Sequence, residues 1–129
     1  MKSHVILIDD NPVDNVLHEQ MLRNFDEDIE ISIIDNSRLA LKFLEQEFSK
    51  KSLEMKTTIF LDEIMPQIRG VEIMESLESM EMIKNNQVQV YFLTTDTSSS
   101  LLEKTAIMPS VRRVIHKPLT AALIESISL

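Results

Sequence analysis

Five short apolar runs alternate along the chain with longer segments of mixed polarity. The runs cover residues 5–8, 29–34, 59–61, 88–93 and 111–115. Short runs in which successive positions are apolar are typical of strands that are covered on both faces. The second run differs, because Ile29, Ile31 and Ile33 alternate with polar residues. We therefore expect the second strand to lie at the edge of a sheet, with one face partly exposed.

The segments between these runs carry apolar residues at helical spacing. In the first segment Pro12 suits a helix start, because proline is tolerated in the first turn. Val13, Val16, Leu17 and Met21 recur on one side of this helix and are its predicted inner face. Candidate caps and inner residues of the later helices are Ser37 with Ala40, Phe43, Leu44 and Phe48; Val71, Met74 and Leu77; one of Ser98, Ser99 or Ser100 with Leu101, Leu102 and Ala106; and Thr120, Leu123, Ile124 and Ile127.

A strand followed by a helix, five times over, predicts an α/β fold. We expect a doubly wound, five-stranded parallel sheet with five helices. A flavodoxin-like strand order 2-1-3-4-5 agrees with this pattern, because it places the alternating second strand at an edge. The 129 residues fit one domain that spans residues 1–129 and is large enough to bury a core.

Composition narrows the possible partners and location. The 13 basic and 21 acidic residues give a net charge of −8. Such a surface argues against binding to nucleic acid, because that binding needs lysine and arginine to neutralise phosphates. The absence of cysteine excludes disulfides and thiolate metal sites. No apolar run approaches the length of a membrane span or a signal-peptide core, so we expect a cytoplasmic protein that does not enter a membrane.

The candidate chemistry lies where the predicted strands end. Asp9 and Asp10 follow the first strand, Asp62 the third, Thr94 the fourth and Lys117 the fifth. In open parallel sheets, ligands bind beyond these ends, at the point where the strand order reverses. Clustered carboxylates repel one another unless a hard cation neutralises them, and Mg²⁺ prefers carboxylates together with water and phosphate oxygens. The sequence thus predicts a site in which carboxylates, a hydroxyl and an ammonium meet.

Each of these residues also has an ordinary interpretation when it is taken alone. Asp9 and Asp10 suit helix capping, Asp62 a turn, Thr94 a loop hydroxyl and Lys117 a helix entry. Their joint position at the strand ends favours the functional interpretation. The histidines offer no ligand spacing, so we expect ordinary, partly exposed roles for His4, His18 and His116.

Four motifs in order carry a family resemblance that spans essentially the whole chain. They are VILIDDNP at residues 5–12, IFLD at 59–62 with MP at 65–66 and Gly70, FLT at 92–94, and IHKP at 115–118. Together they resemble the receiver domains of two-component response regulators. The resemblance implies a single-domain, chemotaxis-regulator-like switch that takes a phosphoryl group from a sensor histidine kinase or a histidine phosphotransfer protein.

The resemblance also implies a role for each matching residue. Asp62 is the phosphoryl acceptor and a ligand of Mg²⁺. Asp10 would bind the metal directly and Asp9 mainly through water, and the backbone carbonyl of Ile64 would complete the protein's share of the coordination. Thr94 would hydrogen-bond a phosphoryl oxygen and act as a switch residue.

The last motif completes the implied site. Lys117 would pair with another phosphoryl oxygen, and the peptide before Pro118 is expected to be cis. A downstream protein partner would dock on the face formed by the helix after Ser98, the last strand and the last helix. The chain would act only on its own phosphorylation and dephosphorylation rather than as an enzyme with an external substrate.

The chain departs from the family pattern at several positions. Val114 replaces an aromatic switch residue, so we expect readout through backbone shifts in the loop after the fourth strand and in the next helix. Ile64 and Thr95 crowd the approach of water, which predicts an acyl phosphate that lasts on the order of tens of minutes or more. Arg69 replaces an acidic residue, and Gly70, the only glycine, is expected at a positive φ.

Alternative functions remain open at this point. A Mg²⁺-dependent phosphohydrolase of the haloacid-dehalogenase type also has a nucleophilic Asp after a parallel strand, but it needs a second Asp where this chain has Ile64. A degenerate receiver would bind partners without phosphorylation. A phosphorelay intermediate would pass the phosphoryl group on to a histidine phosphotransfer protein.

Overall fold

The five apolar runs form one parallel sheet in the computed structural model, which describes residues 3–49, 55–84 and 87–129. The strand order β2-β1-β3-β4-β5 confirms the predicted doubly wound, flavodoxin-like fold. Because β2 is at one edge and pairs with β1, the expectation drawn from its alternating pattern is also confirmed. The strands are β1 Ser3–Ile8, β2 Glu30–Ile34, β3 Lys56–Leu61, β4 Val88–Thr94 and β5 Val111–His116.

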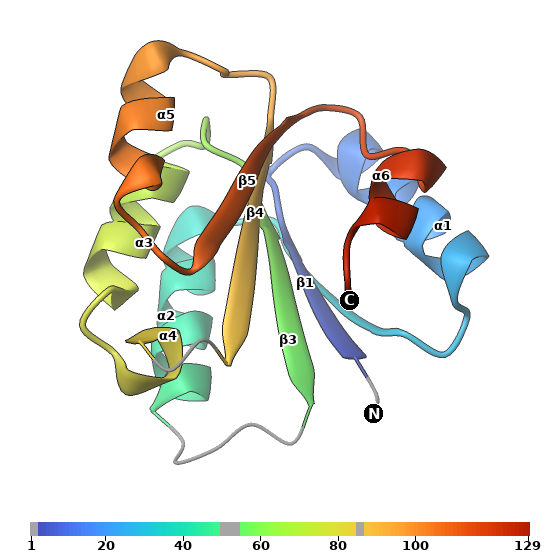
Figure 1. Cartoon of the computed structure of the whole chain (residues 1–129), viewed down its shortest axis with the longest axis horizontal. Coiled ribbons are helices and arrows are strands. Elements are labelled where there is room, and N and C mark those ends of the chain that lie inside the picture. The colour runs from blue at the N-terminus through green and yellow to red at the C-terminus, as the bar shows by residue number, and fades with distance from the viewer. Residues whose placement is uncertain (1–2, 50–54, 85–86) are drawn as a thin grey trace.

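Helices cover both faces of the sheet (Figure 1). The helices α1 and α6 lie together on one face, and α2, α3 and α5 lie on the other. The five predicted helices are present, and within the described ranges a single extra turn, α4, precedes β4. The helices are α1 Pro12–Phe25, α2 Ser37–Phe48, α3 Gly70–Leu77, α4 Glu81–Lys84, α5 Ser99–Ala106 and α6 Ala121–Ser126. No helix in these ranges is long and apolar enough to cross a membrane.

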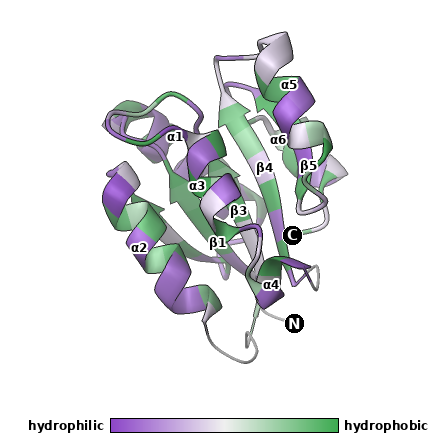
Figure 2. Ribbon diagram, turned by 90° about the vertical axis from the view of Figure 1, so that its left-hand side faces the viewer, coloured by the Kyte–Doolittle hydropathy of each residue, from purple (hydrophilic) through white to green (hydrophobic). Residues whose placement is uncertain are grey.

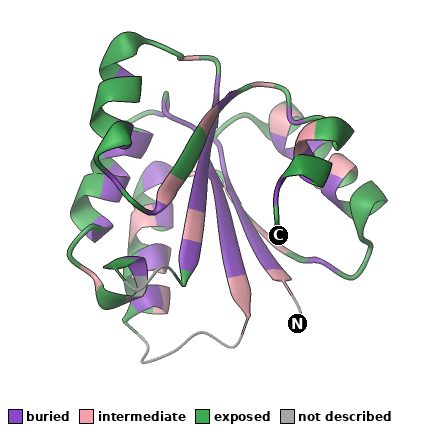
Figure 3. Ribbon diagram, viewed as in Figure 1, coloured by how far each residue is buried: buried purple, intermediate pink, exposed green. Residues whose placement is uncertain are grey.

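Two hydrophobic clusters, one on each face of the sheet, explain the continuous apolar runs. In β1 the side chains of Ile6 and Ile8 belong to the cluster beneath α2 and α3, whereas Val5 and Leu7 belong to the cluster beneath α1 and α6. Successive strand residues point to opposite faces, so a strand between two helix layers must be apolar at every position. Figure 2 shows apolar residues along the strands, and Figure 3 shows that the inner strands β1, β3 and β4 are mostly buried.

The predicted inner face of α1 is wrong. Val13 and Val16 are 73% and 69% exposed, whereas Asn15, His18 and Leu22 are the buried residues of this helix. The helix is rotated from the phase that its valines suggest, because two polar side chains take inner positions. The expectation of partly exposed histidines therefore fails for His18, and it fails also for His4, whose ring bonds Ser32 within the β1–β2 pair.

Two local predictions near the sheet are corrected as well. The cap of α2 is Asn36, whose Oδ1 accepts hydrogen bonds from the amides of Arg38 and Leu39, and Ser37 is the first helical residue. The buried Ser37 hydroxyl instead donates to the carbonyl of Pro66 at 2.6 Å. Gly70 does not have a positive φ; among the described residues that conformation belongs to Gln67, at φ 75°.

Glycine is required at position 70 because the backbone there lies very close to the backbone of Asp62. A Cβ atom added to Gly70 would lie 2.4 Å from the carbonyl oxygen of Asp62 and 3.0 Å from the ring of Phe92. The amide of Gly70 donates to the carbonyl of Glu63 at 3.0 Å, which holds the start of α3 against the end of β3. The glycine therefore lets α3 begin directly above the residue that follows β3.

Candidate functional site

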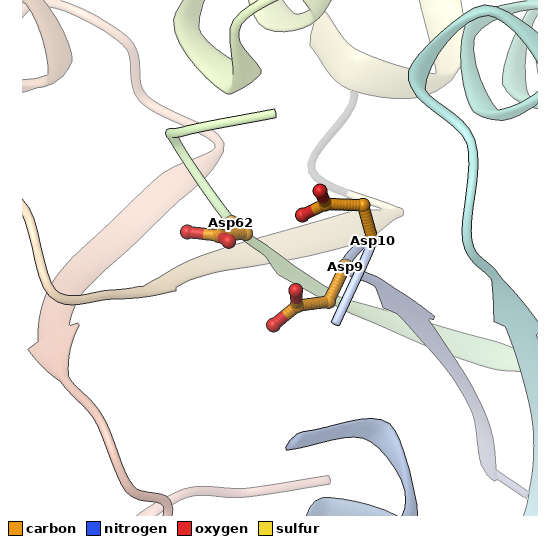
Figure 4. Close-up of side chains that lie close together, drawn as sticks. All are labelled: Asp9, Asp10 and Asp62. Carbon is orange, nitrogen blue, oxygen red and sulfur yellow. The ribbon is translucent and has the colours of Figure 1, made fainter. Parts of the chain in front are cut away.

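The acidic residues meet at the carboxyl ends of two neighbouring strands. Ile8 of β1 lies opposite Leu61 of β3, so the residues that follow leave the sheet side by side. One carboxylate oxygen each from Asp9, Asp10 and Asp62 lies within 4.8 Å of the others (Figure 4). The structure thus brings together the three carboxylates that the strand-end argument predicted.

The three carboxylates differ in their environment. Asp9 and Asp62 are only 5% and 6% exposed, whereas Asp10 is exposed. Burial raises the pKa of Asp9, and the nearby charge of Asp62 adds to this, although hydrogen bonds from Lys117 and from the amide of Asn11 work in the opposite direction. Burial is thus the main reason why the pKa of Asp9 is raised.

Lys117 brings the cation to this site from the end of β5. Its Nζ lies 2.6 Å from Oδ2 of Asp9, 3.3 Å from Oδ2 of Asp62 and 2.8 Å from Oδ2 of Asp14. Burial on its own would lower the pKa of Lys117, but the hydrogen bonds to Asp14 and Asp9 and the charge of Asp62 outweigh burial and raise it. The side chain is therefore a fixed ammonium. The peptide between Lys117 and Pro118 is cis.

Thr94, at the end of β4, is bonded to Lys117 through the backbone. Its carbonyl accepts a hydrogen bond from the amide of Lys117 at 3.0 Å, and its side chain is fully buried. The Thr94 hydroxyl accepts a hydrogen bond from the amide of Asp96 at 3.1 Å. In this conformation the hydroxyl oxygen therefore stabilises the turn after β4.

The other predicted positions lie around the cluster. The side chain of Ile64, in the loop after β3, is 49% exposed. Val114 is half-buried in β5 and packs against the hydrophobic cluster beneath α2 and α3. Neither side chain contributes a polar group. Their predicted roles rest instead on the Ile64 carbonyl and on the small size of Val114.

Two features of the site were missed by reasoning from strand ends. The first is Asp14, which lies in the first turn of α1 and bonds Lys117. Its signal was available, because a helix that begins at Pro12 places its first turn next to the end of β1. Asp14 does not directly follow a strand, so the pattern of residues at the strand ends does not include it.

The second missed feature is a salt bridge between Glu63 and Arg69, next to Asp62. The Glu63 carboxylate is 3% exposed and accepts hydrogen bonds from Arg69 Nε at 3.1 Å and from the amide of Val71 at 2.7 Å. Arg69 also lies 3.6 Å from Asp96 in the loop after β4. Burial raises the pKa of Glu63, against the opposing effects of Val71 and Arg69. Arg69 therefore joins the loops after β3 and β4.

The donor set fits a hard divalent cation. Asp9, Asp10 and Asp62 supply carboxylate oxygens, which are ligands that Mg²⁺ prefers, and the described cluster contains no nitrogen or sulfur ligand. The raised pKa of Asp9 agrees with a site that gains from an added positive charge. The same pocket combines a buried carboxylate with an ammonium, which is an arrangement suited to phosphoryl transfer.

The chain belongs to the response regulator receiver domain family, whose family model matches residues 5–128. It is similar in fold to a two-component response regulator from Cytophaga hutchinsonii, with a TM-score of 0.82 and 24% identity over 98% of this chain and 94% of that one. It is also similar to the phosphorylated cyanobacterial phytochrome response regulator RcpA, with a TM-score of 0.76 and 22% identity over 98% and 89%. No curated protein matches the chain.

A third similar structure is the CheY of the CheX–CheY–BeF3–Mg²⁺ complex from Borrelia burgdorferi, with a TM-score of 0.73 and 17% identity over 95% of this chain and 84% of that one. Receiver domains in general accept a phosphoryl group in two-component signalling, and they bind Mg²⁺ at an acidic pocket. Their partners in general are histidine kinases or histidine phosphotransfer proteins.

Proposed function

We propose that this chain takes a phosphoryl group from a histidine kinase or a histidine phosphotransfer protein onto Asp62. The observation that carries the proposal is the position of this carboxylate. Asp62 is buried, directly follows a strand, and lies within 4.8 Å of the acidic residues after β1 and 3.3 Å from the Lys117 ammonium. A carboxylate fixed in this way can act as a nucleophile without a large rearrangement.

The proposed transfer forms one bond and breaks another. An oxygen of the Asp62 carboxylate attacks the phosphorus of the donor phosphohistidine, and the P–N bond breaks with its electron pair going to the ring nitrogen. The histidine leaves as neutral imidazole, because its other ring nitrogen carries a proton. Lys117 lies close enough to Asp62 to neutralise charge on the phosphoryl oxygens. Asp9, Asp10, Asp62 and the Ile64 carbonyl would hold Mg²⁺, which offsets the remaining negative charge when it is bound.

Incubation with acetyl phosphate and Mg²⁺ tests the proposal directly. The expected result is a mass increase of one phosphoryl group in the wild-type chain and no increase in Asp62→Asn. The absence of an Asp62-dependent increase would overturn the proposal in favour of a receiver that binds partners without phosphorylation. Sustained turnover of p-nitrophenyl phosphate would favour a phosphohydrolase instead.

We further propose that the phosphorylated form changes its affinity for a protein partner at the face formed by α5, β5 and α6. Val114 is half-buried and lacks the ring with which an aromatic residue at this position would act as a switch. The Thr94 hydroxyl, by contrast, accepts a hydrogen bond from the Asp96 amide in the turn after β4, so a movement of this side chain toward a phosphoryl oxygen would break that bond. Readout through this loop and α5 follows from these two positions.

Nuclear magnetic resonance can test this readout. Adding beryllofluoride and Mg²⁺ should shift the amide signals of residues 94–108 more than those of α2, which lies away from the loop. The absence of shifts in residues 94–108, with binding shown by signals around Asp62, would refute the loop readout. A relay role would be shown by transfer of the phosphoryl group from Asp62 to a histidine phosphotransfer protein.

The remaining expectations about partners and location also belong to this proposal. The net charge of −8 supports a protein partner rather than nucleic acid. A location in the cytoplasm agrees with phosphorylation by a histidine kinase. Gel-shift and vesicle-binding experiments at physiological salt are expected to show no binding, and strong binding in either would contradict this part of the proposal.

A further inference from the structure

Asp14 is the carboxylate of the site that lies outside the metal cluster. It belongs to the first turn of α1, and its Oδ2 is 2.8 Å from Nζ of Lys117, a residue 103 positions away. The side chain of Asp14 is 28% exposed and that of Lys117 is 11% exposed, so the pair lies at the rim of the pocket rather than in open solvent. A partly buried, hydrogen-bonded pair of this kind holds its geometry better than an exposed one.

The three partners of Lys117 have different fates during the proposed reaction. The ammonium has three N–H donors, which face Asp9, Asp14 and Asp62. Asp62 becomes an acyl phosphate, and Asp9 belongs to the group of carboxylates that would hold the metal. Asp14 takes part in neither event. It is therefore the one of these three carboxylates that stays available to Lys117 throughout the cycle.

The first turn of α1 is itself tied to the acidic cluster. The amide of Asn11 donates to Oδ1 of Asp9 at 2.9 Å, and Oδ1 of Asn11 accepts from the amide of Asp14 at 3.2 Å. Asn15, next to Asp14, donates from Nδ2 to the carbonyl of Asp9 at 2.8 Å and is buried. These bonds hold the backbone of Asp14 in place relative to Asp9, and the Asp14 carboxylate in turn bonds Lys117.

We propose that Asp14 is a positioning residue for phosphoryl transfer: it holds the Lys117 ammonium at the pocket so that it meets the phosphoryl group arriving at Asp62. This inference rests on the proposed function. It assigns a role to hydrogen-bond geometry and not to the charge of Asp14, since an additional negative charge near the pocket repels an anionic donor. The two effects predict opposite results for suitable variants.

The test compares Asp14→Ala with Asp14→Asn in phosphorylation by acetyl phosphate and Mg²⁺, in which Asp62 attacks phosphorus and acetate leaves. Asp14→Ala removes the acceptor and is expected to slow phosphorylation about tenfold, the size expected when a hydrogen bond between charged groups is lost. Asp14→Asn keeps an acceptor oxygen and is expected to retain a rate within about threefold of wild type.

A matched control lies on the same helix. Glu19 pairs with Arg23 on the surface of α1, at 3.2 Å, so Glu19→Ala also removes a carboxylate from a salt bridge on this helix. Its phosphorylation rate is expected to equal that of the wild type. Thermal unfolding of each variant shows whether the domain is folded, and calorimetric titration with Mg²⁺ shows whether the metal site is intact.

A double-mutant comparison separates positioning from a general structural effect. In a Lys117→Ala background, Asp14→Ala is expected to cause no further loss of rate, because the residue that it positions is gone. An equal loss in both backgrounds, a wild-type rate in Asp14→Ala, faster phosphorylation in both Asp14 variants, or a parallel loss of Mg²⁺ binding would each overturn the inference. Failure of the proposed function would be distinct, because the wild-type chain itself would not be phosphorylated.

Discussion

Replacing Gly70 by alanine separates two explanations for the only glycine in the chain. Gly70 is the first residue of α3, and its φ is not positive. Helix propensity alone predicts that alanine stabilises this position by about 1 kcal/mol. The surrounding atoms predict the opposite sign, because the added Cβ would lie 2.4 Å from the Asp62 carbonyl oxygen and 3.0 Å from Phe92.

The size of the effect follows from which atoms must move. The 2.4 Å contact is with backbone, so no change of side-chain rotamer relieves it. Overpacking of this kind costs typically 1–3 kcal/mol and occasionally more, which exceeds the gain in helix propensity. We expect Gly70→Ala to lower the free energy of unfolding by about 2 kcal/mol, or the melting temperature by roughly 7 °C for a domain of this size.

Urea unfolding of the metal-free protein, followed by circular dichroism, measures this change. Gln67→Gly is the matched control in the same loop, because it places glycine where φ is 75°. It relieves a left-handed conformation, and its cost in unfolded-state entropy is similar, so its unfolding free energy is expected to stay within about 1 kcal/mol of wild type. An equally stable or more stable Gly70→Ala protein would refute the steric argument.

Three further predictions follow from the site. Burial raises the pKa of Asp9 above 3.8, so the ionised carboxylate lowers the stability of the fold at pH 7. In urea unfolding without divalent ions, Asp9→Asn is therefore expected to raise the free energy of unfolding by about 1 kcal/mol. The increase is expected to be smaller when Mg²⁺ is present. Burial lowers the pKa of His18 below 6.5, so the unfolded chain takes up a proton at a higher pH than the folded chain does. The free energy of unfolding should therefore decline as the pH falls below about 6.5. Urea titrations at pH 5.5 and 7.5 should show a smaller decline in His18→Gln than in the wild type. Ile64→Gln, at a half-exposed position, should shorten the lifetime of the acyl phosphate about fivefold in phosphate-release assays, and an unchanged lifetime would argue against exclusion of water by Ile64.

The strand pattern predicted the fold and most of the site for a physical reason. Residues buried on both faces of a sheet must be apolar, so each strand and its end can be read from the sequence. In a parallel sheet those ends lie at one edge, which is why Asp9, Asp10 and Asp62 were expected together, and their carboxylates do lie within 4.8 Å of one another. The strand order needed only the alternation in β2 and the common order of such sheets.

The errors have a different origin, because each depends on a specific contact across the fold. The prediction for the inner face of α1 was wrong because the side chain of Asn15 donates from Nδ2 to the Asp9 carbonyl, a tertiary contact that brings polar residues inward. Apolar periodicity carries no information about such a bond. Asp14 was overlooked because its partner, Lys117, is 103 positions away, and the reason for Gly70 is an approach between two backbones.

The distances along the chain between these groups matter for the order of folding. Asp9 and Asp14 are made early in synthesis, whereas Lys117 follows the last strand and lies 103 positions from Asp14 and further still from Asp9. Long-range parallel pairing forms slowly, because the entropy of loop closure is lost before the contacts are gained. A nascent or shortened chain that ends before β5 has all the carboxylates of the site but lacks Lys117, their ammonium partner. Reactivity toward a phosphodonor therefore reports that the whole sheet has formed.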